Sequence, residues 1–419
     1  MNLALITKIF FVQLICFLSL PFYSCAQQQD ELKFGADRLV EENLSYLVGK
    51  KLGLIVNHTS LLSNRQHLVD ALYSADGIEI TSLFSPEHGI RGDADAGKHI
   101  ADGFDPATGI KIISLYGNTK KPTKEMLNSI DILIYDIQDV GARFYTYIST
   151  LYYAIESAAE NNKKILVLDR PNPISGQKVE GPVLDLNFKS FVGIAKIPIR
   201  HGMTVGELAL LFNDDIKIKK NISAEIEIVK MLNWDRNKYY DDYFSGWLPP
   251  SPNINKLETA IVYPGTCLIE GTNLSEGRGT FEPFLKIGAP FIDAEKVIEE
   301  LNKHSIKGVQ LESVKFTPVS IIGMSASPKL KDTDCNGIRI KVTDRDQFNP
   351  VEFGVKLISV IINLYPDKII FRNDFFDKLA GSDNLRKLLT KKTNPDLIIA
   401  QWQDELKNFL QLRNNYLLY

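Results

Sequence analysis

The sequence predicts an α/β fold, in which a Rossmann-like parallel sheet domain is followed by a smaller α+β auxiliary domain. Two observations predict the sheet. Nearly continuous apolar segments alternate with helical segments through the first half of the chain, which is typical of strands buried on both faces of a parallel sheet. In each repeat the unusual polar residues follow the strand and precede the helix, so these loops should open at one edge of the sheet and form one cleft.

The first domain is expected to span residues 31–255. Its strands are predicted at residues 52–56, 78–84, 110–115, 132–135, 165–168 and 226–231. Helices are predicted between the early strands, at residues 61–73, 123–129 and 144–161. The last of these helices carries one apolar stripe, which indicates packing on a core. The stripe is formed by Tyr147, Leu151, Ala154, Ile155 and Ala158.

A second strand-to-helix unit follows near residue 200. A strand over residues 191–200 should end at His201, and Thr204 should cap the next helix because Glu207 completes a capping box. The segment 247–253, WLPPSPN, is too rich in proline for a regular element and indicates a rigid connector or a cleft rim.

The second domain, residues 256–419, is predicted to be a smaller α+β unit that closes one side of the cleft. Its helices are expected at residues 294–303, 351–364 and 397–412, and its strands at 309–316 and 337–342.

Residues 1–25 have the pattern of a secretory signal. One positive charge at Lys8 precedes an apolar run over residues 9–20, which is too short and wrongly flanked for a transmembrane helix. Two routes of processing stay open: cleavage after Ala26, or lipidation of Cys25 as in bacterial lipoproteins. The sequence therefore predicts export across the inner membrane to the periplasm, with contact to the membrane only through a lipid anchor at Cys25.

The composition limits the classes of protein. After removal of the signal about 390 residues remain, which with 44% hydrophobic content suffice for two domains. Only Cys267 and Cys335 certainly stay in the mature chain, so at most one disulfide forms and the core depends on apolar burial. The net charge of -3 shows no bias toward nucleic acid or an anionic membrane surface.

Two nucleotide-binding patterns are incomplete. No G-x-G-x-x-G follows the first strand, so the dinucleotide fingerprint is missing. Residues 92–98, GDADAGK, fit a phosphate loop as far as the lysine, but His99 replaces the required Ser or Thr, and Asp93 and Asp95 would repel phosphate. We therefore expect no nucleotide and no cofactor.

The loop after the second strand is the first candidate site. Within residues 81–97, TSLFSPEHGIRGDADAG, Glu87 stands between Pro86 and His88 rather than at a plain helix cap. It is one of five carboxylates at or near strand ends, and a pair of carboxylates that flank a bond is the usual apparatus of glycoside hydrolysis. These carboxylates are Glu87, Asp136, Asp139, Asp169 and Glu180. For Asp169 the alternatives are an ion pair with Arg170 or a helix cap.

Other polar residues suit a sugar ligand. Four side chains could form hydrogen bonds with hydroxyls, an N-acetyl group or a lactyl carboxylate: Arg143, Tyr145, Arg170 and Asn172. The forked guanidinium of an arginine suits a carboxylate in particular. Helix packing is the alternative for Tyr145 and Tyr147.

A second loop, residues 263–280, places charged and amide groups among glycines that let the backbone approach a ligand. These groups are Glu270, Asn273, Glu276 and Arg278. Its alternative is a glycine-rich surface turn.

A metal site is the competing interpretation. Its candidate ligands are His58, His88, Asp93, Asp95 and His201. These histidines are single residues on different loops, with no H-x-x-x-H or H-E-x-x-H spacing. We therefore expect no metal.

Many ordered motifs resemble those of the NamZ-type exo-β-N-acetylmuramidases, a bacterial family of glycoside hydrolases. They are PEHGIRGDADAG, YDIQDVGARFYTYISTL, LDRPNPISG, VEGPVLD, IPIRHGMTVGEL, PSPNI, YPGTCLIEGTNLSEGRGT and RNNYLLY. The resemblance covers almost everything after the signal. It implies release of non-reducing terminal N-acetylmuramic acid from peptidoglycan fragments in cell-wall recycling, by a Rossmann-like catalytic domain with an auxiliary domain.

The resemblance also assigns roles. Glu87 is expected to be the acid/base, and Glu180 the second carboxylate, with Asp139 and Glu270 as alternatives. Arg143 or Arg170 would hold the lactyl carboxylate. The predicted substrate-binding residues are His88, Arg91, Arg143, Tyr145, Arg170, Asn172, His201, Glu270, Asn273, Glu276 and Arg278. The rival functions are a metal-dependent periplasmic hydrolase and a non-catalytic sugar-binding protein.

Overall fold

The computed structural model describes residues 31–87, 89–92, 102–117 and 119–419. One compact unit runs from Leu32 to Tyr419. The predicted signal with Cys25, the catalytic-loop residue His88, and the metal candidates Asp93 and Asp95 lie outside the described residues.

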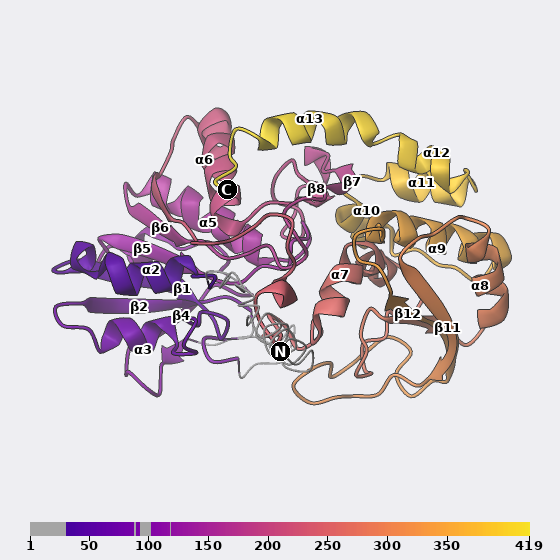
Figure 1. Cartoon of the computed structure of the whole chain (residues 1–419), viewed down its shortest axis with the longest axis horizontal. Helices are drawn as coiled ribbons and strands as arrows, with labels where there is room; N and C mark the ends of the chain where they lie inside the picture. The colour runs from indigo at the N-terminus through magenta and orange to yellow at the C-terminus, as the bar shows by residue number, and fades with distance from the viewer. Residues whose placement is uncertain (1–30, 88, 93–101, 118) are drawn as a thin grey trace, which may run out of the picture. The chain divides into compact units, whose positions relative to one another are not determined.

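A seven-stranded sheet forms the first half of this unit (Figure 1). Its strands are β1 (Lys51–Val56), β2 (Glu79–Ser85), β3 (Gly103–Phe104), β4 (Lys111–Ser114), β5 (Ile132–Asp136), β6 (Lys164–Leu168) and β9 (Glu225–Val229). They lie in the order β3-β4-β2-β1-β5-β6-β9, and every neighbouring pair is parallel except β3 with β4. The predicted α/β fold is confirmed, and of the seven strands of this sheet only the two-residue edge strand β3 was missed.

The strand order contains a switch point between β1 and β5. From β1 the chain builds outward through β2 to β4, then returns to β5 on the other side of β1. Open α/β sheets bind ligands beyond the carboxyl ends of their strands at such a point, because the loops there diverge and leave a crevice. The segments after β1, β5 and the adjacent β2 are therefore the first place to look for a site.

Helices cover both faces of the sheet. On one face α2 (Gly35–Glu42) and α3 (Leu68–Tyr73) pack against the side chains of residues such as Leu54. On the other, α4 (Lys124–Leu127), α5 (Tyr147–Glu160) and α6 (Val205–Lys220) pack against residues such as Ile55. Successive strand residues thus enter different cores, which explains the continuous apolar runs.

Two predictions about helix starts have different outcomes. The capping box of α6 is confirmed, since Glu207 N donates to Thr204 Oγ1 and Thr204 N donates to Glu207 Oε2. The helix predicted over residues 61–73 begins only at Leu68, because His67 Nδ1 caps it by accepting from Val69 N. Residues 61–67 form a turn instead.

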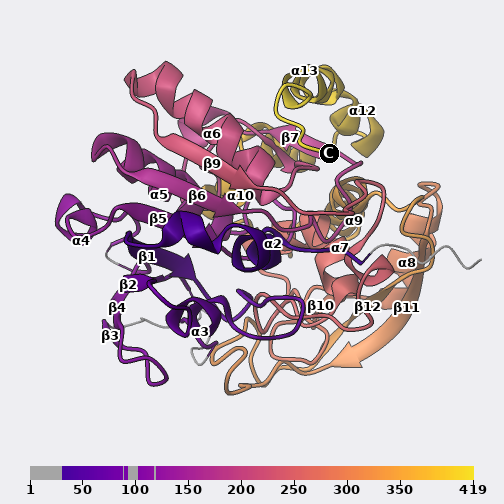
Figure 2. The same cartoon turned by 60° about the vertical axis from the view of Figure 1, so that its left-hand side comes forward.

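The second half contains a three-stranded antiparallel sheet, visible beside the large sheet in Figure 2. Its order is β10 (Lys286–Ala289), β12 (Cys335–Val342), β11 (Val309–Phe316). The surrounding helices are α7 (Leu257–Thr266), α8 (Ala294–Asn302), α9 (Pro350–Leu364), α10 (Asn373–Ala380), α11 (Asn384–Thr390), α12 (Pro395–Ala400) and α13 (Gln403–Arg413). The single helix predicted over residues 397–412 is wrong, because α12 and α13 are separated at the buried Trp402.

A small antiparallel pair, β7 (Glu180–Val183) and β8 (Pro198–Arg200), lies outside both sheets. The strand predicted over residues 191–200 is therefore right only for its last three residues. Short 3-10 turns complete the chain: η1 (Leu44–Leu47), η2 (Leu186–Phe188), η3 (Tyr240–Asp242) and η4 (Cys267–Gly271).

The loop predicted over residues 263–280 is only partly a loop. Tyr263 to Thr266 form the last turn of α7, and η4 follows directly. Most of the segment is buried, so the alternative of a surface turn is wrong.

After α13 the chain returns to the large sheet, where Figure 1 marks the C-terminus beside α6. Tyr416 Oη donates to Asp214, and Tyr419 Oη donates to Asp169. Because these contacts join the predicted halves and the unit Leu32–Tyr419 is undivided, the domain boundary at residue 255 stays a prediction.

Both remaining cysteines, Cys267 and Cys335, are free and buried. Across the described residues no helix combines the length and the apolar character that a membrane span needs.

Candidate active site

Glu87 lies directly after β2, half-buried, and tyrosine side chains surround it. Tyr116 Oη donates to Glu87 Oε1 at 3.0 Å, and Tyr147 Oη lies 3.4 Å from the Glu87 carbonyl oxygen. Burial and the negative charge of Glu87 raise the pKa of both phenols above the ordinary value. Both therefore stay protonated at neutral pH, as donors that hold the glutamate.

Asp139 follows β5 and faces His201 in the interior. Asp139 Oδ2 accepts from Gly141 N at 2.7 Å, and His201 Nε2 lies 3.5 Å from the same oxygen. Gly141 adopts φ 85°, and a Cβ there would lie 2.5 Å from Asn172 Oδ1, so this turn requires glycine. Asp139 Oδ1 and His201 Nε2 are buried and have no hydrogen-bond partner among the described residues.

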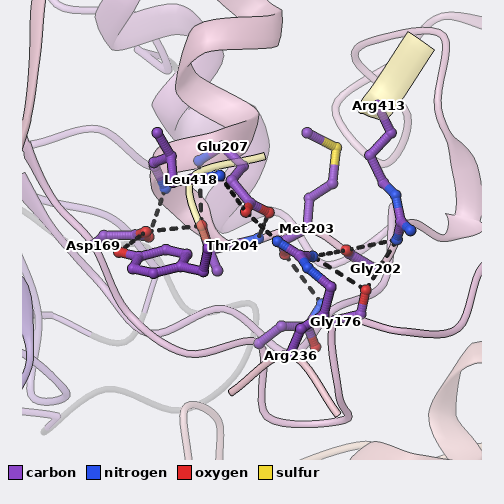
Figure 3. A network of polar contacts seen from close by, with 12 residues as sticks. Asp169, Gly176, Gly202, Met203, Thr204, Glu207, Arg236, Arg413 and Leu418 are labelled. Carbon is purple, nitrogen blue, oxygen red and sulfur yellow. Dashed lines mark hydrogen bonds and ion pairs between the residues drawn. The ribbon is translucent and has the colours of Figure 1, made fainter. Parts of the chain in front are cut away.

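Hydrogen bonds from other parts of the chain hold the loop that begins at His201. Met203 N donates to His201 Nδ1 at 3.2 Å, while Arg236 and Arg413 each donate to the Gly202 carbonyl at 3.0 Å (Figure 3). Gly202 has φ 61°, and a Cβ there would lie 2.6 Å from Arg413 Nη1. The orientation of the imidazole therefore depends on an arginine at the end of α13.

The same network continues to the last residues of the chain, as Figure 3 shows. Asp169 Oδ2 accepts from Thr204 Oγ1 and from Tyr419 Oη, both at 2.8 Å, and Leu418 N donates to Glu207. Burial, with a smaller contribution from Glu207, raises the pKa of Asp169 to about 7. Asp169 is thus a helix cap, as one of the two alternatives proposed.

Asn57 follows β1 at the switch point. Its Oδ1 accepts from Thr59 N at 2.9 Å and from Thr59 Oγ1 at 2.6 Å, which leaves Nδ2 as a buried donor without a partner. Asn57 and Tyr145 both lower the pKa of Tyr147 against the effect of burial, so both side chains lie near its phenol. The alignment gives no hydrogen bond that satisfies Asn57 Nδ2 or Tyr145 Oη.

Aromatic rings connect this group to the second half of the chain. The rings of Tyr145 and Tyr147 meet edge to face at 5.0 Å between centroids, and Tyr145 meets Tyr263 of α7 at 6.2 Å. Burial strongly raises the pKa of Tyr145, and Glu87 and Asp139 both contribute to the shift. Tyr145 therefore stands between the two carboxylates and α7, and helix packing alone does not describe it.

The proline-rich segment contacts the group through two backbone carbonyls. His58 Nε2 lies 2.8 Å from the Pro249 carbonyl oxygen, and Tyr147 Oη donates to the Pro250 carbonyl at 3.0 Å. The metal candidate His58 is thus engaged with the backbone.

The second candidate loop supplies a guanidinium. Arg278 Nε donates to Glu270 Oε1 at 2.8 Å and lies 3.7 Å from Glu276 Oε1. Both ion pairs use Nε, and a quarter of the Arg278 side chain stays exposed. Glu270 and Arg278 both affect the pKa of Tyr263, which places this loop next to the tyrosine group.

Glu180 does not join Glu87. It lies in β7, where Oε1 pairs with Arg200 at 2.6 Å and Oε2 accepts from Val351 N at 3.3 Å. Since both oxygens have protein partners in a buried setting, these contacts argue against Glu180 as the second carboxylate. Asp139, one of the two alternatives, is the better candidate.

Neither arginine predicted to hold a lactyl group is available. Arg143 is fully buried and donates to three carbonyl oxygens, those of Pro182, Ile197 and Leu379. Arg170 forms a buried bidentate pair with Asp136, at 2.5 and 2.8 Å. The alternative pair of Arg170 with Asp169 is wrong.

Three more predicted binding residues have structural partners instead. Arg91 pairs with Asp70 and Asp105. The amide of Asn172 bonds the backbone at Met203 and Ile174, and that of Asn273 bonds it at Lys368 and Ile370.

Among the described residues no three His, Cys, Asp or Glu side chains are grouped as metal ligands. Of the five metal candidates only His58 and His201 are among the described residues. His58 contacts the Pro249 carbonyl oxygen, and His201 lies beside Asp139.

Sequence reasoning missed Asn57, Tyr116 and Tyr263 as site residues and left Tyr147 open between helix packing and a ligand contact. The available signal was position, because Asn57 and Tyr116 directly follow apolar strands in the way that identified Glu87.

Comparisons with known proteins cover both halves of the chain. A family model described as "Exo-beta-N-acetylmuramidase NamZ, N-terminal" matches residues 52–258, and its C-terminal counterpart matches residues 261–419. The peptidoglycan beta-N-acetylmuramidase NamZ of Bacillus subtilis (strain 168) is 44% identical over 393 residues, 94% of this chain and 92% of that protein.

Two solved structures are also similar. Both are crystal structures of DUF1343 family proteins from Bacteroides fragilis NCTC 9343, each 34% identical and covering 93% of this chain and 99% of the other. Their TM-scores are 0.85 and 0.77.

Proposed function

The chain belongs to the NamZ family of exo-β-N-acetylmuramidases, and we propose that Glu87 and Asp139 carry out its reaction. It is a glycoside hydrolase that releases N-acetylmuramic acid from the non-reducing ends of peptidoglycan fragments, in keeping with cell-wall recycling.

One observation carries the assignment of the two carboxylates. Glu87 follows β2 and Asp139 follows β5, the two strands that flank β1, and both contribute to the raised pKa of Tyr145 and Tyr147. Glycosidases need one carboxyl group that protonates the departing oxygen and one that stabilises the positive charge at the anomeric carbon. Glu87 is the acid, because it lies at the half-exposed edge of the group, where the departing sugar can leave. Asp139, which is buried beside His201, is the second carboxylate.

Arg278 is the candidate for the lactyl carboxylate. Its ion pairs use Nε and leave its side chain partly exposed, whereas Arg143 and Arg170 are buried in structural contacts. A guanidinium can offer two parallel N–H donors to a carboxylate. This group distinguishes muramic acid from glucosamine, so Arg278 would set specificity at the terminal sugar.

Export is a further part of the proposal. The support is the signal pattern of residues 1–25, and Cys25 would add a lipid anchor if it is the processed residue. Fractionation of cells that carry wild type or Cys25→Ala tests it: an anchored protein leaves the membrane fraction on substitution, while a free periplasmic protein is unaffected.

The reaction is tested by release of free N-acetylmuramic acid from a disaccharide with muramic acid at its non-reducing end. Wild type should release the sugar with and without chelator, and Glu87→Gln should lower kcat by about 100-fold or more. Glu79→Gln is the matched control, since this exposed residue lies at the opposite end of β2. Loss of release in chelator would favour a metal-dependent hydrolase, and tight binding without release a sugar-binding protein.

A further inference from the structure

Within the part of the chain that the structure describes, four buried polar atoms at the switch point have no hydrogen-bond partner. They are Asn57 Nδ2, Asp139 Oδ1, Tyr145 Oη and His201 Nε2. They come from three connecting segments: Asn57 follows β1, Asp139 and Tyr145 lie between β5 and α5, and His201 follows β8. Leaving a buried polar group unsatisfied costs about 1–3 kcal/mol, so four of them in one place indicate a ligand or water that they are built to bind.

The neighbouring hydrogen bonds determine whether each of these atoms can donate or accept a hydrogen bond. Asn57 Oδ1 is held by Thr59, so Nδ2 is a donor. His201 Nδ1 accepts from Met203 N, so Nε2 carries the ring proton. Asp139 Oδ1 is an acceptor, since Oδ2 already takes the Gly141 amide. With the tyrosine hydroxyl, the set comprises one carboxylate acceptor and donors around it.

The four groups are close together. His201 Nε2 lies 3.5 Å from Asp139 Oδ2. The Tyr145 ring contacts the Tyr147 ring, and the Asn57 amide lies beside the same Tyr147 phenol. The negative charge of Asp139 contributes to the raised pKa of Tyr145, which places these two side chains near each other. The four groups thus form one cluster of buried polar atoms, next to the carbonyl of Glu87 that Tyr147 contacts.

We propose that these atoms form the receptor for the 2-acetamido group of the muramic acid. An acetamido group presents one N–H donor and one carbonyl acceptor, which matches Asp139 Oδ1 on one side and Asn57 Nδ2 with Tyr145 Oη on the other. His201 Nε2, 3.5 Å from the other oxygen of Asp139, is a further donor beside this acceptor. The proposal rests on the proposed function, whose substrate carries this group.

This placement makes the acetamido oxygen the attacking group. It attacks C1 while the C1–O bond to the departing sugar breaks and Glu87 gives its proton to the departing oxygen. The amide proton passes to Asp139 Oδ1, which leaves a neutral oxazoline. Water then attacks C1 and gives a proton to Glu87, the oxazoline C1–O bond breaks, and Asp139 returns its proton to nitrogen. Substrate assistance of this kind is an established variant of glycoside hydrolysis.

The first test varies the basicity of the attacking oxygen. The substrates are 4-nitrophenyl β-glycosides of muramic acid that carry N-acetyl, N-fluoroacetyl, N-difluoroacetyl and N-trifluoroacetyl groups. If the acetamido oxygen attacks, kcat/KM of the wild type should fall by about 100-fold or more along the series. A flat series, or release of the α-anomer as the first product, would overturn the proposal.

The second test needs no turnover. The thiazoline analogue of N-acetylmuramic acid, a stable mimic of the oxazoline, should bind wild type and lose about tenfold or more in affinity in Asn57→Asp and in Tyr145→Phe. Tyr152→Phe is the matched control: it removes a hydroxyl on α5 that bonds Asp215 and should keep full affinity. Equal affinity in all four proteins would mean that the four atoms hold water only, and the proposal would be wrong. A wild type that binds the thiazoline but hydrolyses no muramic acid glycoside would refute the proposed function and support the receptor.

Discussion

Asp169→Asn should remove a pH dependence of stability that the wild type carries. Asp169 is fully buried, and its pKa is raised to about 7 in the folded protein from 3.8. Between these values the folded state binds the proton and the unfolded state does not, so stability is greater at low pH and falls as pH rises through 7. Above pH 8 both states are ionised and the loss is complete.

The size of the effect follows from the shift. A difference of about 3 pKa units corresponds to about 4 kcal/mol over the full range, of which about 3 kcal/mol falls between pH 5 and pH 8. Asparagine has the same shape and no charge. Its Oδ1 can accept from Arg170 N and Gly206 N, and its Nδ2 can donate to the hydroxyl oxygens of Thr204 and Tyr419, all of which contact the carboxylate now.

Urea denaturation at several pH values between 5 and 8 measures the effect. The buried Trp234, whose ring lies 5.1 Å from that of Tyr419, is a suitable fluorescent reporter. The difference in unfolding free energy between wild type and Asp169→Asn should change by about 3 kcal/mol across this range. Asp131→Asn, at the amino end of β5, should keep the wild-type pH profile. An unchanged difference at every pH would refute the reasoning.

Three substitutions separate binding roles from structural ones. Arg278→Met should raise KM for a muramic-acid disaccharide by about tenfold or more and leave a glucosamine-terminated analogue unaffected, since only the former carries a carboxylate; equal effects on both would count against lactyl recognition. Arg143→Met should lower the unfolding free energy by about 3 kcal/mol, because three carbonyls lose a charged donor, with KM unchanged in the fraction that folds; a stable variant with raised KM would restore Arg143 as a ligand contact. Glu180→Gln should lower thermal stability by weakening the buried pair with Arg200 and keep kcat within about threefold of wild type; a loss as large as that of Glu87→Gln would make Glu180 the second carboxylate after all.

Elements with a strong local pattern were predicted well. The strands before Asn57, Glu87 and Asp139 were placed within a residue or two, because a buried strand is marked by its own consecutive apolar residues. The capping box of α6 was equally local, since its two partners are three residues apart. Helix ends set by tertiary contacts were not predictable in this way, and α12 and α13 were merged because the buried Trp402 continues the apolar pattern across their junction.

The sequence by itself determined the fold class, the family, and the edge of the sheet where the chemistry lies, because these depend on the order of strands and loops along the chain. Tertiary structure alone decided the roles of the charged residues. Glu180 pairs with Arg200, Arg170 with Asp136, and Arg143 with the carbonyl of Leu379. A charged side chain is available to a ligand only if no protein group has already satisfied it, and these partners are brought together by folding rather than by spacing.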